Sequence, residues 1–365
     1  MNKSWMILCA ATLATMAFAD GDNGDVKVSG NADVYYQWNL HNVGGDLSLR
    51  PSDAKTKTVT LNTARVSLRP KTEKKLMWTV DLTLGKSPDA LNALEPGGRD
   101  KYKIIEQAFV TYGLSKGSLD FGKFVSPVGI EVADTTQNLN YTRGMNSTYG
   151  VPAYHAGLRY NTSLSDMPAQ IYLATGWNEV ESSNNNMSLG LHVEKKVAGG
   201  WDVAGNYYTG HEGRRTPAKH NSNSLGGVGF TTAGIRDVHL FDVTAKYKAN
   251  ANTDVALEYL SGNAYHVGPA TNLKWSGFAG YVGYKAGAKT TVGLRTEIFR
   301  DIDGAFSGQS QDLASTTLTF KHEVTSGQTA IIEWRGDRSN KAIFATGGPA
   351  KKYRDSLLLG YQVKF

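Results

Sequence analysis

Hydrophobic and polar residues alternate with a period of two along most of the chain. Between Thr291 and Ile298, for example, every second residue is apolar or a threonine, and Arg295 and Glu297 lie on the opposite face. This alternation predicts strands that separate an apolar from a polar environment. Sixteen such segments are predicted, at residues 26–38, 57–69, 75–86, 103–114, 117–125, 154–163, 167–178, 187–198, 200–211, 236–249, 252–264, 274–286, 289–301, 312–325, 327–338 and 354–365.

The connections between these segments are alternately short and long. Short links such as 248–252, 285–289 and 325–327 alternate with long polar loops, among them 126–153 and 211–235. Short periplasmic turns with long external loops are typical of bacterial outer-membrane barrels, and an even strand count puts both termini on the periplasmic side. Because 211–235 is long enough for another hairpin, eighteen strands is the alternative to sixteen.

Composition excludes a helical membrane protein. Hydrophobic residues make up 40% of the chain, mean hydropathy is −0.35, and no apolar run beyond the first nineteen residues is long enough for a spanning helix. Backbone groups in hydrocarbon must pair with one another, which leaves a closed barrel as the other way to cross. The predicted fold class is therefore all-β, a transmembrane antiparallel β-barrel.

The first nineteen residues have the features of an export signal. Lys3 precedes an apolar stretch, and Ala17-Phe18-Ala19 is a small-x-small cleavage pattern. We expect a signal peptide at 1–19 and a barrel domain at 20–365. The single cysteine, Cys9, would leave with the signal, so neither disulfides nor cysteine metal ligands are expected.

Charged residues within the strands are expected to face the lumen, because an arginine or lysine facing lipid at mid-depth costs about 2–4 kcal/mol. The ten candidates comprise five bases and five acids, so the wall alone predicts little ion preference. They are Arg159, Lys246, Arg295, Lys321 and Arg335, with Glu194, Glu258, Glu297, Glu323 and Glu333.

Aromatic residues gather toward both ends of the predicted strands, as interfacial girdles do. The outer band is predicted to include Trp177, Phe241, Tyr259 and Phe299, and the periplasmic band Trp201, Tyr247 and Tyr284, among others. The alternative is that these residues reflect only the general preference of aromatics for strands.

The third long loop carries the most specific motif, Gly122-Lys-Phe-Val-Ser-Pro-Val-Gly-Ile-Glu131. This stretch resembles the OmpL-like β-barrel porins and, more distantly, the phosphate-selective porins, over roughly residues 119–160. The resemblance implies an outer-membrane barrel with passive channel activity, whose third loop folds inward. The loop has no lysine cluster, so phosphate selectivity is not carried over.

Physical reasoning also gives loop 126–153 a role beyond connection. Its 28 residues exceed an ordinary connector, and Pro127 and Gly129 bend the chain where the strand ends. An inward fold would place Glu131, Asp134 and Arg143 at a pore constriction. In the alternative, these charges coat an external loop.

No catalytic motif accompanies this pattern. Hydrolase, zinc-protease and phosphate-loop signatures are absent from the sequence, and its eight histidines are scattered. We expect no enzyme activity, no cofactor and no metal. The net charge of +6 is spread without a basic block, so no nucleic-acid partner is expected.

The predicted function is an outer-membrane porin for passive diffusion of small hydrophilic solutes and ions. Alternatives are a specific oligosaccharide or anion channel, with Tyr141, Tyr149 and Tyr154 as a sugar path, or a non-conducting structural or adhesive barrel. Expected partners are outer-membrane lipid, the solutes, and the barrel-assembly machinery through the strand ending at Phe365; the sequence leaves a homotrimer open.

Overall fold

The computed structural model describes residues 25–41, 46–72, 74–92, 102–212, 236–266, 272–344 and 349–365. The predicted signal peptide lies outside this part of the chain and stays a prediction. Among the described residues, no helix is both long and apolar enough to cross a membrane.

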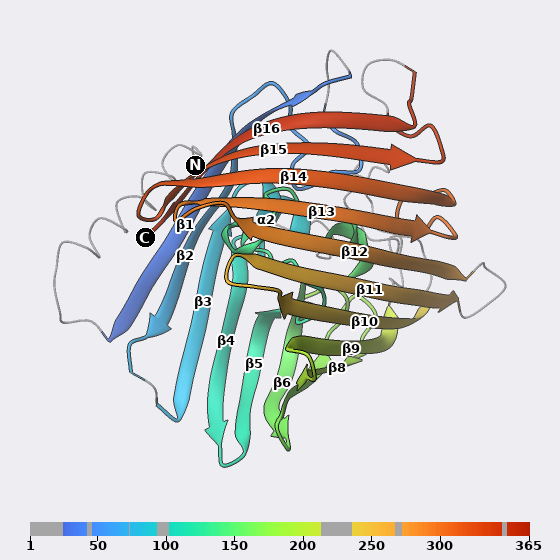
Figure 1. The fold of residues 1–365 in the computed structure, drawn as a ribbon. Coiled ribbons are helices and arrows are strands. Elements are labelled where there is room, and N and C mark those ends of the chain that lie inside the picture. Colours follow the sequence, from blue (N-terminus) through green and yellow to red (C-terminus); the bar gives the residue numbers. More distant parts are fainter. Residues whose placement is uncertain are drawn as a thin grey trace, which may run out of the picture.

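Sixteen antiparallel strands form one closed barrel, in which each strand pairs with its sequence neighbours and β1 pairs with β16 (Figure 1). The strands are β1 (Val26–Asn39), β2 (Thr60–Pro70), β3 (Leu76–Leu84), β4 (Ile105–Leu114), β5 (Gly117–Val125), β6 (Tyr154–Leu164), β7 (Met167–Ala174), β8 (Ser188–Val197), β9 (Trp201–Glu212), β10 (Arg236–Lys248), β11 (Thr253–His266), β12 (Leu273–Lys285), β13 (Thr290–Asp301), β14 (Gln311–Thr325), β15 (Gln328–Ser339) and β16 (Tyr353–Lys364).

The barrel confirms the predicted fold class and all sixteen predicted strands. Strands β9 and β10 pair directly along their length, from Glu212 opposite Arg236 to Trp201 opposite Tyr247. The eighteen-strand alternative required a hairpin between them, within a segment whose residues 213–235 lie outside the described part. Because β9 and β10 are neighbours in the closed sheet, the alternative is wrong.

Burial alternates along the strands as the sequence pattern predicts. In β13, Leu294 and Ile298 are 39% and 49% exposed on the outer face, whereas Arg295 and Glu297 on the inner face are buried. On the outer face near the short turns, Trp201 stacks on Tyr247 with ring centroids 4.9 Å apart. The apolar face of the wall therefore points outward, toward lipid in a membrane.

Two aromatic predictions are wrong. Trp177 and Phe299 were expected in the outer girdle, but they are 2% and 0% exposed and belong to a buried hydrophobic cluster inside the barrel. Phe299 follows Arg295 and Glu297 on the inner face of β13. The prediction used only the position of each aromatic residue near a strand end, whereas the alternation along β13 puts Phe299 on the same face as Arg295 and Glu297.

Irregular pairing interrupts the alternation of inward-facing and outward-facing residues in the early strands. The β1–β2 register shifts at Asp33, because Asn62 is an extra residue of β2, and both Asn62 and Thr63 are buried. A second shift between β3 and β4 makes Glu106 the extra residue. Each bulge changes which residues face inward.

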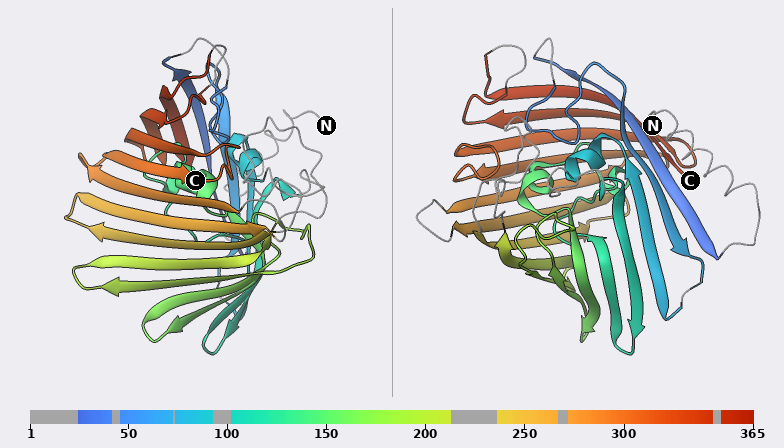
Figure 2. Two further views of the ribbon diagram at one scale, coloured as in Figure 1. Left: turned by 90° about the vertical axis from the view of Figure 1, so that its right-hand side faces the viewer. Right: turned by 180° about the vertical axis from the view of Figure 1, so that it is seen from behind.

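Among the described residues, three short helical segments lie within the ring of strands: α2 (Lys86–Leu91), η1 (Thr135–Gln137) and η2 (Asn146–Gly150) (Figures 1 and 2). The hydrophobic cluster occupies the long-loop half of the interior. Tyr149 of η2 packs against Phe299 and Phe306, and the Trp275 ring packs on Phe306. This half of the interior is therefore packed with side chains and loop segments.

Candidate pore constriction

Residues 126–153, called the inner loop below, leave the end of β5 and turn into the barrel. The Ser126 N–H donates to the Ala153 carbonyl over 3.0 Å, which closes the base of the loop. Gly129 has a φ of 88°, a conformation that glycine adopts readily, and its N–H donates to Asp242 of β10 over 3.2 Å. The turn thus directs the chain across the lumen, away from the exterior.

Glu131 forms the centre of a buried charge network with the opposite wall. Its carboxylate accepts a hydrogen bond from Arg295 of β13 and one from the Gly144 N–H at 2.7 Å. Arg295 also donates to the Thr142 carbonyl over 2.7 Å and lies 3.3 Å from Glu297. One arginine therefore joins both arms of the inner loop to the wall.

This network keeps Glu131 ionised. Burial alone would raise the pKa of Glu131, but the Arg295 and Arg143 guanidiniums and the Gly144 N–H outweigh it, so the pKa lies below its ordinary value. The negative charge of Glu131 is therefore compensated locally and adds little to the field in the lumen.

Asp134 joins the inner loop to the first two strands. Its carboxylate accepts hydrogen bonds from Asn31 of β1 at 3.1 Å and from Arg65 of β2 at 3.1 Å. Burial opposes ionisation here too, but hydrogen bonds from Thr136 and Gln137 and the charge of Arg65 hold the pKa of Asp134 below its ordinary value. Asp134 is an anchor for the loop.

Arg143 does not project into open water. It is 5% exposed, and its guanidinium donates to the Val132 carbonyl over 2.8 Å and to the Ser147 hydroxyl over 2.5 Å. Its own carbonyl accepts from Arg335 of β15 over 2.6 Å. The three residues expected at a constriction thus belong to the inner loop inside the barrel, and all three are buried there.

The returning arm of the inner loop is bonded to β14 and β15. Glu333 accepts from the backbone N–H groups of Tyr141 and Thr142 at 2.6 and 3.0 Å. Asn140 donates to the Thr319 hydroxyl over 2.7 Å, and Lys321 donates to the Asn138 carbonyl over 2.5 Å. Buried backbone groups of the loop are thereby satisfied by wall side chains, which fixes its position.

All ten residues expected to face the lumen occupy inner-face positions of their strands. Arg295, Glu297, Lys321, Glu333 and Arg335 bond to the inner loop. The other five lie elsewhere on the inner wall. Arg159 pairs with Asp120, and Glu194 pairs with His192. Lys246 lines a cavity, Glu258 is buried beside Gly129, and Glu323 is half-buried near the short turns.

The sequence analysis did not identify the residues of β1 and β2 that bind the inner loop. Asp33 accepts from the Thr135 and Tyr141 hydroxyls at 2.7 and 2.6 Å, and Arg65 binds Asp134. The available signal was a polar or charged residue at every second position, from Lys27 to Asp33 and from Thr63 to Arg69. The bulge at Asn62 obscured it by changing the alternation.

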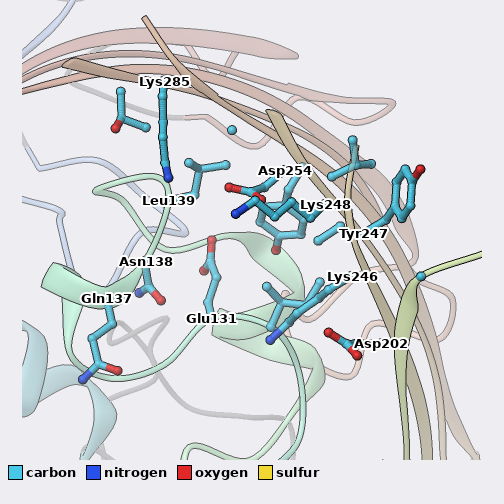
Figure 3. Close-up of a pocket in the computed structure, with 17 residues that line it drawn as sticks. Glu131, Gln137, Asn138, Leu139, Asp202, Lys246, Tyr247, Lys248, Asp254 and Lys285 are labelled. Atoms are coloured by element: carbon cyan, nitrogen blue, oxygen red, sulfur yellow. The ribbon is translucent and has the colours of Figure 1, made fainter. Parts of the chain in front are cut away.

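Within the described part of the chain, two cavities open on the short-turn side of the inner loop. The larger, about 420 Å³, lies between the loop and β9–β13; in Figure 3, Lys246, Lys248 and Lys285 extend from this wall toward the loop. The second, about 380 Å³, is lined by β1, β2 and β16. Gln137 of η1 borders both cavities, so the inner loop separates them.

Comparisons with solved structures agree with this architecture. The anion-selective porin from Comamonas acidovorans superposes with a TM-score of 0.63 at 11% identity, covering 93% of this chain and 99% of that one. In-vitro-folded OmpT of Vibrio cholerae gives 0.62 at 12% identity, covering 95% and 99%. The channel DcaP of Acinetobacter baumannii gives 0.56 at 13% identity, covering 93% and 97%. At these identities the likeness shows the fold.

A sequence comparison shows the family to which the chain belongs. No curated protein matches the chain, but the family model described as "Putative beta-barrel porin-2, OmpL-like" matches residues 25–365. The match extends the resemblance seen around the inner loop to the whole barrel. The chain belongs to this OmpL-like family and is a porin of the bacterial outer membrane.

Proposed function

We propose that the protein is a diffusion porin in which the inner loop forms the constriction and small hydrophilic solutes and ions pass between the loop and the wall. The observation that carries this proposal is the set of bonds that fix Glu131, Asp134 and Tyr141 to β13, β1, β2 and β15 across the lumen. Transport then requires no chemistry, and the protein has no enzyme activity.

The tyrosines considered as a sugar path do not support an oligosaccharide channel. Tyr141, Tyr149 and Tyr154 are 1%, 4% and 4% exposed, so their ring faces are covered. Their hydroxyls are bonded to Asp33, the Leu49 carbonyl and the Asn178 carbonyl. A sugar ring can stack only on an exposed aromatic face, and the faces of these three rings are covered.

Close packing in the long-loop half of the interior favours a second candidate function, that of a structural barrel sealed by its own loops. Planar-bilayer recording separates the two. A diffusion porin gives discrete, ohmic conductance steps, and vesicles containing it swell in small sugars faster than in large ones. Folded protein that gives no steps and no swelling would be a structural barrel, and the diffusion proposal would fail.

Export, assembly and oligomerisation complete the proposal. Residues 1–19 direct export, and the C-terminal strand is the assembly signal; the Phe365 N–H donates to the Gly30 carbonyl over 3.0 Å, which places this residue at the β1–β16 closure. A homotrimer is proposed because one solved neighbour, OmpT of Vibrio cholerae, is described in a trimer form.

A further inference from the structure

The two cavities on the short-turn side, together called the vestibule, are lined by an excess of cations. Three charged residues of the lining, Arg65, Glu131 and Asp134, are held in the buried networks described above. The charged side chains that remain are six bases and two acids: Lys27, Arg69, Lys246, Lys248, Lys285 and Lys364, with Asp202 and Asp254.

Strand register divides these charges into two groups. On β9–β11, Lys246 lies opposite Asp202 and Lys248 lies opposite Asp254, so each cation has an acidic cross-strand neighbour. These two lysines and two aspartates therefore contribute little net charge.

The other four cations lack that compensation across the strands. Lys27 of β1 lies directly opposite Arg69 of β2, Lys364 of β16 lies opposite Asn31, and Lys285 of β12 lies opposite Thr291. Like charges directly opposite one another destabilise a sheet, so the Lys27–Arg69 pair does not contribute to the stability of the wall.

In the cavity lined by β1, β2 and β16, acidic side chains are less exposed than the cations. Arg69 pairs with Asp81 over 2.8 Å, but the Asp81 side chain is 0% exposed, whereas that of Arg69 is 33% exposed. Lys364 is exposed and donates over 3.1 Å to the Thr136 carbonyl, which carries no net charge. The charged side chains of this lining that are not buried are therefore Lys27, Arg69 and Lys364.

We propose that the vestibule is an anion-attracting chamber and that the channel therefore conducts small anions, such as chloride, phosphate and short carboxylates, in preference to cations. The inference rests on the proposed diffusion function and adds its ion preference. Low-dielectric walls strengthen the field of one sign of charge inside a cleft and raise the local concentration of counter-ions. Cations lining a pore favour anion passage for the same reason.

The test is the zero-current potential in a potassium chloride gradient. The wild type should show an anion-selective potential. Replacing Lys27, Lys285 and Lys364 by glutamine leaves three cations and two acids in the vestibule and should reduce the preference. The corresponding glutamate triple leaves three cations and five acids and should reverse the sign of the potential.

Lys289 provides the matched control. Lys285 and Lys289 flank the same short turn between β12 and β13, but Lys289 is exposed and is not part of the cavity lining. Lys289→Gln should leave the potential unchanged. An arginine triple at positions 27, 285 and 364 should keep the anion preference, which separates the effect of charge from that of packing.

The outcomes distinguish this inference from the proposed function. If folded wild-type protein gives no conductance, the diffusion proposal fails, and the ion preference fails with it. If the protein conducts but the wild type is non-selective or cation-selective, only the vestibule inference is overturned. It is likewise overturned if the glutamate triple shifts the potential no more than Lys289→Gln does.

Discussion

The inner-loop network and the vestibule contain similar charged residues that have different roles. Around the inner loop, Arg295, Glu131 and Glu297 have side chains at most 3% exposed and bonded to one another or to the backbone. In the vestibule, Lys27, Lys285 and Lys364 are exposed. A buried, paired charge fixes structure, whereas an exposed, unmatched charge acts on ions in the water. Burial decides the role more than the sign of the charge does.

The largest expected effect is on stability, from Arg295→Leu. This change leaves Glu131 and Glu297 buried without their cation, and breaking a buried pair costs about 3–5 kcal/mol. Lys285→Leu in the vestibule should change stability by less than about 0.5 kcal/mol, as surface substitutions do. Denaturant unfolding in detergent micelles, followed by tryptophan fluorescence, measures both. Equal losses would contradict the difference drawn between the two regions.

A slightly smaller loss is expected one residue away, on the other face of β13. Leu294→Arg places a charge toward lipid and should cost about 2–4 kcal/mol if the site lies near mid-depth. Assembly into outer membranes, assayed by the gel shift of folded barrels, should fall, while Leu294→Ile should assemble normally. Normal assembly of Leu294→Arg would mean that the inward and outward faces of β13 are exchanged.

Acid should loosen the inner loop. The pKa values of Glu131 and Asp134 lie below their ordinary values of 4.5 and 3.8, so their stabilisation is present above those values and is lost as pH falls through the lower folded-state pKa. Each pKa unit is worth about 1.4 kcal/mol. Proteolysis of the inner loop should therefore accelerate only at acidic pH.

Asp134→Asn offers the comparison for that experiment. This substitution removes one of the two titrating carboxylates, so the rate of proteolytic cleavage should depend less on pH. At neutral pH, the protease should cut the inner loop of the variant faster than that of the wild type. A loop that is cut equally fast at neutral and acidic pH in the wild type would show that these carboxylates do not anchor it.

The smallest effect concerns salt. The Debye length falls from about 10 Å at 0.1 M to about 3 Å at 1 M, so the exposed vestibule charges should lose most of their influence on ions in concentrated salt. The zero-current potential, measured at a fixed concentration ratio, should move toward zero as both solutions are made more concentrated. Buried pairs are screened much less, so unfolding stability should change little over the same range.

The strands could be predicted because lipid contact leaves a local signature. In β13, the alternation of Leu294 and Ile298 with Arg295 and Glu297 is visible in neighbouring residues. The inner loop was recognisable by its length, bend and family motif. Its partners were not, because Asn31 and Asp134 are separated by 103 positions and meet only through the closed barrel.

Arg143 illustrates the same limit. Its charge and its place in the loop favoured an ion-facing role, but the Val132 carbonyl and Ser147 enclose it. Trp177 and Phe299 show the converse, since aromatic residues expected at the lipid interface fill the interior. The positions of Arg143 and of Trp177, which lies beyond the end of β7, depend on how segments pack in three dimensions. The inward face of Phe299, by contrast, follows from the alternation along β13.

The position of the inner loop is the central claim, and a disulfide tests it most directly. Asn140 of the loop and Thr319 of β14 are bonded side chain to side chain at 2.7 Å, and the only native cysteine is Cys9. In a background with Cys9 replaced by alanine, Asn140→Cys with Thr319→Cys should crosslink on oxidation without changing conductance. Asn140→Cys paired with the outward-facing Thr316→Cys should not crosslink. A folded barrel in which the first pair stays reduced, or crosslinks no better than the second, would contradict the inward fold of residues 126–153.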